Sequence, residues 1–140
     1  MGKVDYNQVY YLQNIINTHQ HSIYATQSEI ASIDEKLSRL RSAKRSLQTI
    51  QTEVNHIRQS QDNLENVPNW RGQTKSDFMV DWYEWSSYYR QFQNDLDAFQ
   101  DDIRDEITRL ENQKNEKDDI IGWLSSQINS LGNEIEKLFY

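Results

Sequence analysis

Apolar residues recur every seven positions along the first half of the chain, with polar residues between them. They form three lines: Val9, Ile16, Ile23, Ile30 and Leu37; then Leu12, Ile33, Leu40, Leu47 and Val54; then Ala43, Ile50, Ile57 and Leu64. The third line begins where the first line reaches Lys44. A seven-residue period is slightly shorter than two helical turns of 3.6 residues each. Such a stripe therefore winds around its helix, as in a left-handed supercoil. The pattern predicts one long helix.

The second half repeats this pattern. Its three lines are Phe78, Trp85, Phe92 and Phe99; Trp82, Tyr89, Leu96, Ile103, Leu110, Leu124, Leu131 and Leu138; and Ile107, Ile121, Ile128 and Ile135. Lys114 and Lys117 interrupt the last two lines, within the polar run 111–119. In an antiparallel hairpin this run falls opposite residues 21–29, so both helices should lose their apolar contact at the same height. Whether the helices break there is left open.

A turn separates the two halves, in the stretch VPNWRGQTKSDF of residues 67–78. Pro68 is the chain's only proline, and it can neither continue a helix nor follow a residue with helical backbone angles. Gly72 tolerates a positive φ. Three elements are therefore expected: helix one over about 5–65, a turn over about 66–74 and helix two over about 75–139.

Both helices carry a capping pattern at the expected start. Asp5 with Gln8 resembles a capping box, and Thr74 with Asp77 forms the S/T-x-x-D pattern just before Phe78. With 36% hydrophobic residues, the chain is too polar for a multilayer core and too periodic to be disordered. The predicted fold class is all-α: a single domain over 1–140, an elongated antiparallel two-helix hairpin, coiled-coil-like, that completes a helical bundle with partner chains.

Charge supports an antiparallel register. In a hairpin centred near residue 70, facing residues have numbers that add to about 140. A basic stretch of helix one then faces an acidic stretch of helix two: Lys36, Arg39, Arg41, Lys44 and Arg45 against Asp95, Asp97, Asp101, Asp102 and Asp105. Each exposed pair contributes only ~0–1 kcal/mol. The alignment nevertheless penalises other registers.

Composition excludes several functions. The net charge is −7, and all of it lies in residues 68–140, so the chain has no basic face for nucleic acid. No apolar run approaches the ~18 residues of a membrane span, which argues against membrane insertion. Lys3 is followed by polar residues, so no secretory signal peptide is expected. The chain has no cysteine and hence no disulfide.

Catalytic and metal sites are not expected. His19 and His21 are two residues apart and point in different directions on a helix, and His56 stands alone. No phosphate-binding loop, zinc spacing or nucleophile elbow occurs. Acidic pairs such as Asp101 and Asp102 lie on a solvated helix face. We therefore expect no enzyme activity, no cofactor and no metal.

The aromatic cluster at residues 77–92 is the richest feature of the sequence. Five of its side chains share one helix face, and their default role is packing on helix one: Phe78, Trp82, Trp85, Tyr89 and Phe92. Tyr83 and Tyr88 lie to either side of that stripe and are candidates for partner contact. Trp123 lies off the line of Leu124 and is a further candidate. All eight are candidate partner-binding residues.

Trp70 in the turn has two interpretations. Its indole could cover the open end of the helix pair, or it could belong to a recognition surface. The tripeptide Trp70-Arg71-Gly72, at the turn of a helical hairpin without cysteine or signal peptide, resembles the WXG family of type VII secretion proteins. Phe78 in the first turn of helix two fits a longer WXG-like subgroup, encoded beside LXG-domain toxins. These are small helical hairpins that pair into bundles.

The resemblance implies a function. It points to a non-catalytic partner, a targeting chaperone that binds the helical N-terminal region of a type VII secreted LXG toxin and helps its export. The location would be the cytoplasm before export and the medium afterwards. Secreted members carry Tyr-x-x-x-Asp/Glu, but no tyrosine here has an acidic residue four positions on, and Phe78 has Asp81 one position too close for the related Phe-x-x-x-Asp signal. Either a partner would then supply the signal, or this protein is not itself what the secretion machine recognises.

The apolar lines predict a partner independently of the family. Three lines per helix make a stripe wider than a two-stranded contact requires, so another helical pair should cover the surplus. The partner would be an LXG toxin, another small helical protein or a second copy of the chain. Two alternatives stay open: a homodimeric secreted WXG-like factor acting alone, and a cytoplasmic coiled-coil adaptor.

Overall fold

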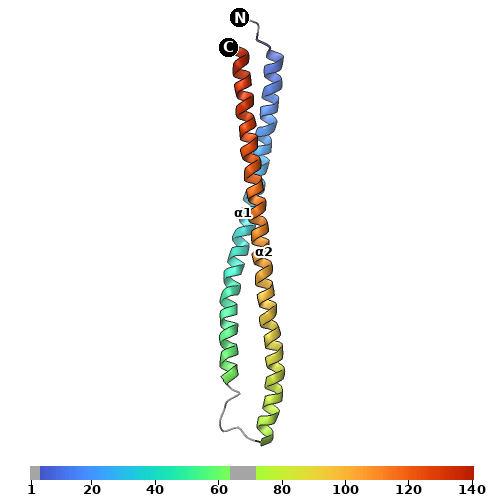
Figure 1. Ribbon diagram of the computed structural model, residues 1–140, viewed down its shortest axis with the longest axis vertical. Helices are drawn as coiled ribbons and strands as arrows, with labels where there is room; N and C mark the ends of the chain where they lie inside the picture. Colours follow the sequence, from blue (N-terminus) through green and yellow to red (C-terminus); the bar gives the residue numbers. More distant parts are fainter. Residues whose placement is uncertain (1–3, 64–71) are drawn as a thin grey trace. The chain divides into compact units, whose positions relative to one another are not determined.

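The computed structural model describes residues 4–63 and 72–140, almost all of them helical. Helix α1 spans Tyr6–Asp62 and helix α2 spans Gly72–Phe139 (Figure 1). The described residues contain no strand. The all-α fold class is therefore confirmed. Both helices continue through residues 21–29 and 111–119, so the polar stretches do not interrupt them.

The N-terminus of α1 is capped as the sequence predicts. The Asp5 Oδ1 atom accepts a hydrogen bond of 3.2 Å from the backbone N–H of Gln8. The Val9 N–H donates to the Asp5 carbonyl at 3.1 Å, which begins the helical ladder. A side-chain acceptor at this position satisfies one of the four N–H groups that lack an intrahelical partner.

The start of α2 differs from the expectation. The helix begins at Gly72, so Thr74 lies inside it and is not its N-cap, contrary to the predicted S/T-x-x-D cap. Gly72 has a φ of +75°, a left-handed angle that glycine adopts at little cost. Gly72 thus adopts the positive φ that the sequence allows at this position. This angle changes the direction of the backbone two residues before Thr74. Pro68 and Trp70 lie outside the described residues.

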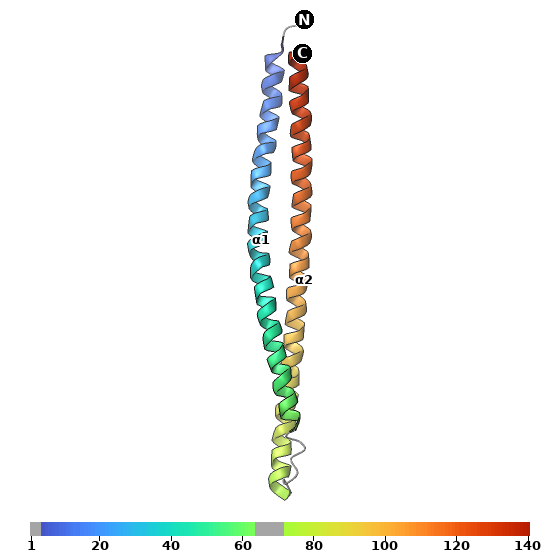
Figure 2. The same ribbon diagram turned by 90° about the vertical axis from the view of Figure 1, so that its left-hand side faces the viewer.

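The chain divides into two compact units. Unit 1 comprises Met1–Ser38 and Thr108–Tyr140, and unit 2 comprises Arg39–Ile107. Within each unit, a segment of α1 packs antiparallel on a segment of α2, as Figures 1 and 2 show. Hydrogen bonds and ion pairs join the two segments in unit 1, as at Lys117 and Glu29, and in unit 2, as at Tyr89 and Val54. The antiparallel pairing predicted from the sequence holds in both.

Residues that face the other helix alternate at spacings of three and four, as in a coiled coil. We label the seven positions of the repeat a to g, with Val9 and Ile107 at a and Leu12 and Leu110 at d. The contact between the two helices along positions a and d is called the seam. Every residue less than 10% exposed lies in it: Val9, Leu12, Ile33, Leu37, Val54, Trp82, Ser86, Gln100, Ile103, Ile107, Leu110 and Leu124.

The register differs from the predicted one. Facing residue numbers add to 143 at Tyr89 and Val54 and to 146 at Lys117 and Glu29, not to 140. In unit 2, Trp82 pairs with Gln61 in the last turn of α1. The first turns of α2 therefore extend past the end of α1 (Figure 1). The prediction assumed that both helices reach equally far toward the turn.

Candidate protein-binding face

In unit 1 the seam is apolar at position a of α1 and over most of α2, while position d of α1 alternates between Leu12, His19, Thr26 and Ile33. Position a of α1 carries valine, isoleucine or leucine from Val9 to Leu37, and the facing positions of α2 carry isoleucine and leucine from Ile121 to Leu138. A polar layer interrupts it: the Lys114 Nζ atom lies 2.7 Å from Asp34 Oδ1, and Lys117 pairs with Glu29. The sequence predicts a loss of apolar contact at the polar run 111–119, and the structure shows that loss at Lys114 and Lys117.

In unit 2 the composition of the seam changes. Position d stays apolar, at Leu40, Leu47 and Val54 of α1 and at Trp82, Tyr89, Leu96 and Ile103 of α2. Position a becomes polar, at Lys44, Gln51 and Arg58 of α1 and at Ser86, Gln93 and Gln100 of α2. The missing apolar residues stand at position g instead, three residues after d.

These g positions form one surface, which we call the aromatic face: Ala43, Ile50 and Ile57 of α1 with Trp85, Phe92 and Phe99 of α2. In an antiparallel helix pair, the g positions of both helices flank the same side of the seam, and the e positions flank the other side. All six residues are exposed, from 37% at Trp85 to 53% at Phe99 among the five large side chains. Contiguous exposed apolar patches are often interaction sites, so this surface is a candidate for one.

Two aromatic residues at position d hold the aromatic face in place. The Tyr89 hydroxyl donates a hydrogen bond of 2.6 Å to the Val54 carbonyl. The Tyr89 ring stacks on Trp85, with centroids 4.8 Å apart, and contacts Phe92 at 6.3 Å. The two exposed rings therefore rest on a side chain that is anchored to the other helix. Such preorganisation lowers the entropic cost of binding.

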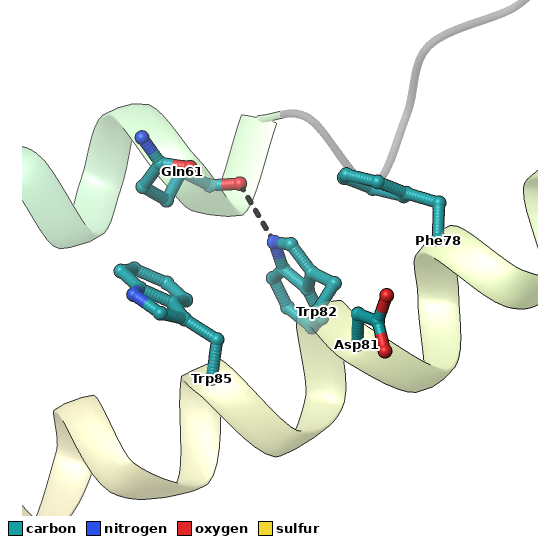
Figure 3. A pocket seen from close by; sticks show the side chains of 5 residues that line it. All are labelled: Gln61, Phe78, Asp81, Trp82 and Trp85. Atoms are coloured by element: carbon teal, nitrogen blue, oxygen red, sulfur yellow. Dashed lines mark hydrogen bonds between the residues drawn. The ribbon is translucent and has the colours of Figure 1, made fainter.

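Trp82 anchors the end of unit 2 nearest the turn. It is 8% exposed, and its indole Nε1–H donates to the Gln61 carbonyl at 3.2 Å (Figure 3). Gln61 lies in the last turn of α1, where carbonyls lack intrahelical partners, so the indole satisfies one of them. Beside it the Arg58 guanidinium donates to the Ser86 carbonyl at 2.9 Å.

An open pocket of about 270 Å³ lies at this end of unit 2. Its lining combines aromatic and polar groups: Gln61, Phe78, Asp81, Trp82 and Trp85 (Figure 3). Phe78 and Trp85 occupy successive g positions, so the pocket continues the aromatic face toward the turn. Among the described residues that line it, Asp81 carries the one charged group.

The structure thus separates the five side chains that the sequence places on one helix face. Trp82 and Tyr89 pack against α1 as expected. Trp85 and Phe92 do not, since they are 37% and 47% exposed. Phe78 is half-buried.

The other candidates lie away from the seam. Tyr88 is 67% exposed at position c, and Tyr83 is exposed at position e, with its ring 5.2 Å from that of Trp82. Trp123 is 58% exposed in unit 1, where its ring meets His19 edge-on at 6.0 Å. His19 is half-buried at position d of the seam, whereas His21 is exposed, so the two side chains do point in different directions.

Sequence analysis missed part of the aromatic face. Ile50, Ile57 and Phe99 belong to predicted apolar lines, but they were not named among the candidate partner-binding residues. The signal that distinguishes them is the polar residue one position later on each helix: Gln51, Arg58 and Gln100 take the seam positions. In unit 2 the polar residues at position a face the other helix. The apolar residues one position earlier, at g, therefore lie outside the seam.

Residues 15–133 match the model of the YwqH-like family, over most of both units. The chain belongs to the YwqH-like family. This is a helical-hairpin family associated with LXG toxin operons, which agrees with the fold described above. The match to the YwqH-like model includes the whole aromatic face. A comparison with curated proteins found no match.

Membrane spans and metal clusters are both absent from the described residues. Neither α1 nor α2, as far as they are described, combines the length and apolar character that a membrane crossing requires. Within residues 4–63 and 72–140, no three histidine or carboxylate side chains gather where they could hold a metal ion.

Proposed function

We propose that this YwqH-like protein is a non-catalytic, WXG-like binding partner of a type VII secreted LXG toxin, acting as its targeting chaperone. The exposed aromatic face of unit 2 is the observation that carries the proposal. The association of the family with LXG toxin operons supplies the class of partner.

The proposed mechanism is mutual coverage of apolar helix surfaces. The long helical N-terminal region of the toxin exposes an apolar stripe until it is packed. The aromatic face would cover part of that stripe, and the toxin helix would cover Ile50, Ile57, Trp85, Phe92 and Phe99 in return. Central aromatic side chains contribute most of the binding energy in such interfaces.

Export follows from the same complex in this proposal. The chain has neither the Tyr-x-x-x-Asp/Glu nor the Phe-x-x-x-Asp pattern. The secretion signal is therefore contributed by a partner, and this chain adds helical surface to a composite signal. The protein is cytoplasmic before export and leaves with the toxin by a route that needs no cleaved signal peptide.

Co-expression with the LXG toxin encoded in the same operon tests this function. The tagged full chain is purified, and the mass of the complex is measured by light scattering. A stoichiometric complex with the toxin is expected, lost in Phe92→Gln and retained in the control Tyr24→Gln, which changes a 67% exposed aromatic residue of unit 1. A homodimer that does not bind the toxin would favour a homodimeric secreted factor that acts alone. A monomer that does not bind the toxin would favour the cytoplasmic coiled-coil adaptor.

A further inference from the structure

The two edges of the aromatic face differ in charge. Position c borders position g on the side away from the seam. On α2 the c positions beside the face are Asp81, Tyr88, Asp95 and Asp102; on α1 they are Arg39, Ser46, Glu53 and Ser60. All eight are exposed. The α2 edge therefore carries three carboxylates at four positions, and the α1 edge carries no net charge.

The pocket at the turn end has the same character. Its carboxylate, Asp81, lies between Trp82 and Phe78, and the Trp85 ring lines the same pocket on the other side of Trp82 (Figure 3). A lysine or arginine side chain satisfies both kinds of group at once, because its charge pairs with the carboxylate and its cation favours an aromatic ring face. A volume of about 270 Å³ accommodates one such side chain.

A second copy of this chain does not offer the complementary edge. If two aromatic faces met with α2 over α2, the Asp81, Asp95 and Asp102 edges would face each other and repel. If α2 met α1, the acidic edge would meet one arginine, one glutamate and two serines. Neither arrangement neutralises the three carboxylates. Charge complementarity therefore favours a different partner.

We infer that the aromatic face binds an amphipathic helix of another protein whose apolar stripe is bordered by lysine or arginine along the edge that lies over α2. One of those cations enters the pocket lined by Asp81 and Trp85. This inference rests on the proposed function for the class of partner, and it adds the chemistry by which that partner is recognised. The apolar stripe provides the affinity, and the acidic edge sets the orientation of the bound helix.

Designed peptides test this inference with the full chain. The probe is a four-heptad helix with leucine at its a and d positions and lysine along one edge. One comparison peptide carries glutamate along that edge, and another keeps the lysines but has its leucines replaced by glutamine. Titration calorimetry at physiological salt measures each affinity. We expect the lysine-edged leucine peptide to bind at least tenfold more tightly than either comparison peptide.

Two pairs of variants locate the site. Asp95→Asn with Asp102→Asn should weaken the lysine-edged peptide about fivefold, as expected for two exposed ion pairs. Asp118→Asn with Asp119→Asn, an equal change in charge at exposed positions of unit 1, should change it less than twofold. Phe92→Gln should weaken it at least tenfold, and Tyr24→Gln should not. Circular dichroism confirms that each variant stays helical.

The other outcomes test the inference and the proposed function separately. Equal affinity for lysine-edged and glutamate-edged peptides would remove the charge rule, and no binding would remove the docking site. A stable homodimer that dissociates in Phe92→Gln would assign the face to a second copy. If the toxin complex forms but is unaffected by Phe92→Gln, the proposed function stands and this inference fails. If the lysine-edged peptide binds as expected and no toxin co-purifies, the inference stands without the toxin.

Discussion

Units 1 and 2 use the same heptad register but place their apolar residues differently. In unit 1 the apolar line that runs along the helix pair occupies a and d, where the two helices cover it. In unit 2 it occupies d and g, and position a holds Lys44, Gln51, Arg58, Ser86, Gln93 and Gln100. At 3.5 residues per turn, this change rotates the centre of the stripe by about 50° around each helix. The rotation leaves half of the stripe outside the seam.

The difference shows that one hairpin can cover the apolar stripe in one unit and leave part of it exposed in the other. Unit 1 covers the apolar residues of its seam, with Leu37 only 2% exposed, and its exposed aromatic residues, such as Tyr24 and Trp123, lie outside the seam. Unit 2 leaves five large apolar side chains on one side, while the Gln100 amide Nε2 is buried without a hydrogen-bond partner. The seam buries the Gln100 amide while the adjacent Phe99 side chain stays exposed. Such an arrangement is not the most stable one for two helices without a partner.

The largest effect should come from comparing one apolar residue of each unit. Leu37→Ala removes a fully buried side chain of unit 1 and should lower the free energy of unfolding by about 3 kcal/mol. Ile50→Ala in unit 2 should lower it by less than about 1 kcal/mol, because Ile50 is 43% exposed and alanine favours helix. Urea denaturation of the isolated chain measures both. Equal losses would mean that Ile50 is buried in solution.

A smaller effect is expected at the anchor of the aromatic face. Tyr89→Phe deletes the hydroxyl that bonds to the Val54 carbonyl and should lower the free energy of unfolding by about 1 kcal/mol. The adjacent Tyr88→Phe is the matched control, since Tyr88 is 67% exposed, and it should have no effect. Thermal unfolding followed by circular dichroism compares them. A stability change shared by both variants would contradict the anchoring role of Tyr89.

Glycines should respond with opposite signs. Gly72→Ala in unit 2 should lower stability by about 1–2 kcal/mol, because its φ of +75° is unfavourable for residues with a Cβ atom. Gly132→Ala in unit 1 should raise stability by up to about 1 kcal/mol, since a Cβ there meets no atom within 4 Å and alanine is the better helix former. Melting temperatures decide the signs. A stabilising Gly72→Ala would rule out the left-handed start of α2.

The smallest effect should come from the polar layer of unit 1. Lys117→Ala removes the pair with Glu29, whose side chain is 55% exposed. The expected loss is about 0.5 kcal/mol at low salt, decreasing further at 1 M salt because exposed charges are screened. Denaturation at two salt concentrations measures the loss, with Lys137→Ala near the C-terminus as the control. A salt-independent loss would show that the lysine stem, and not its charge, supports the seam.

Much of the fold follows from the sequence because a heptad repeat specifies both the helix and the side that it buries. The Asp5 cap, the antiparallel pairing and the polar layer at Lys114 and Lys117 were predicted on that basis and are confirmed. The register was wrong because nothing in the sequence states how far α2 extends past α1. The predicted cap at Thr74 was wrong because Gly72 already provides the change of backbone direction.

The candidate site was only partly predictable. Sequence analysis found three apolar lines per helix and inferred a surplus, but it could not say which line is left outside. Which line lies in the seam depends on the contacts that each line makes with the other helix. Tyr89 and Trp82 hold their line in the seam by donating hydrogen bonds to carbonyls of α1. Side-chain bonds to a partner helix leave no periodic trace in the sequence. The role of Trp70 stays a prediction, since it lies outside the described residues.

The antiparallel arrangement also bears on the order of folding. The Tyr89–Val54 contact closes a loop of 35 residues, and the Lys117–Glu29 contact closes one of 88. The difference in closure entropy amounts to only about 0.8 kcal/mol, because this entropy grows with the logarithm of loop length. One buried leucine outweighs that difference. The end of the chain farthest from the turn is therefore free to form early, and the aromatic half can remain the last part to become ordered.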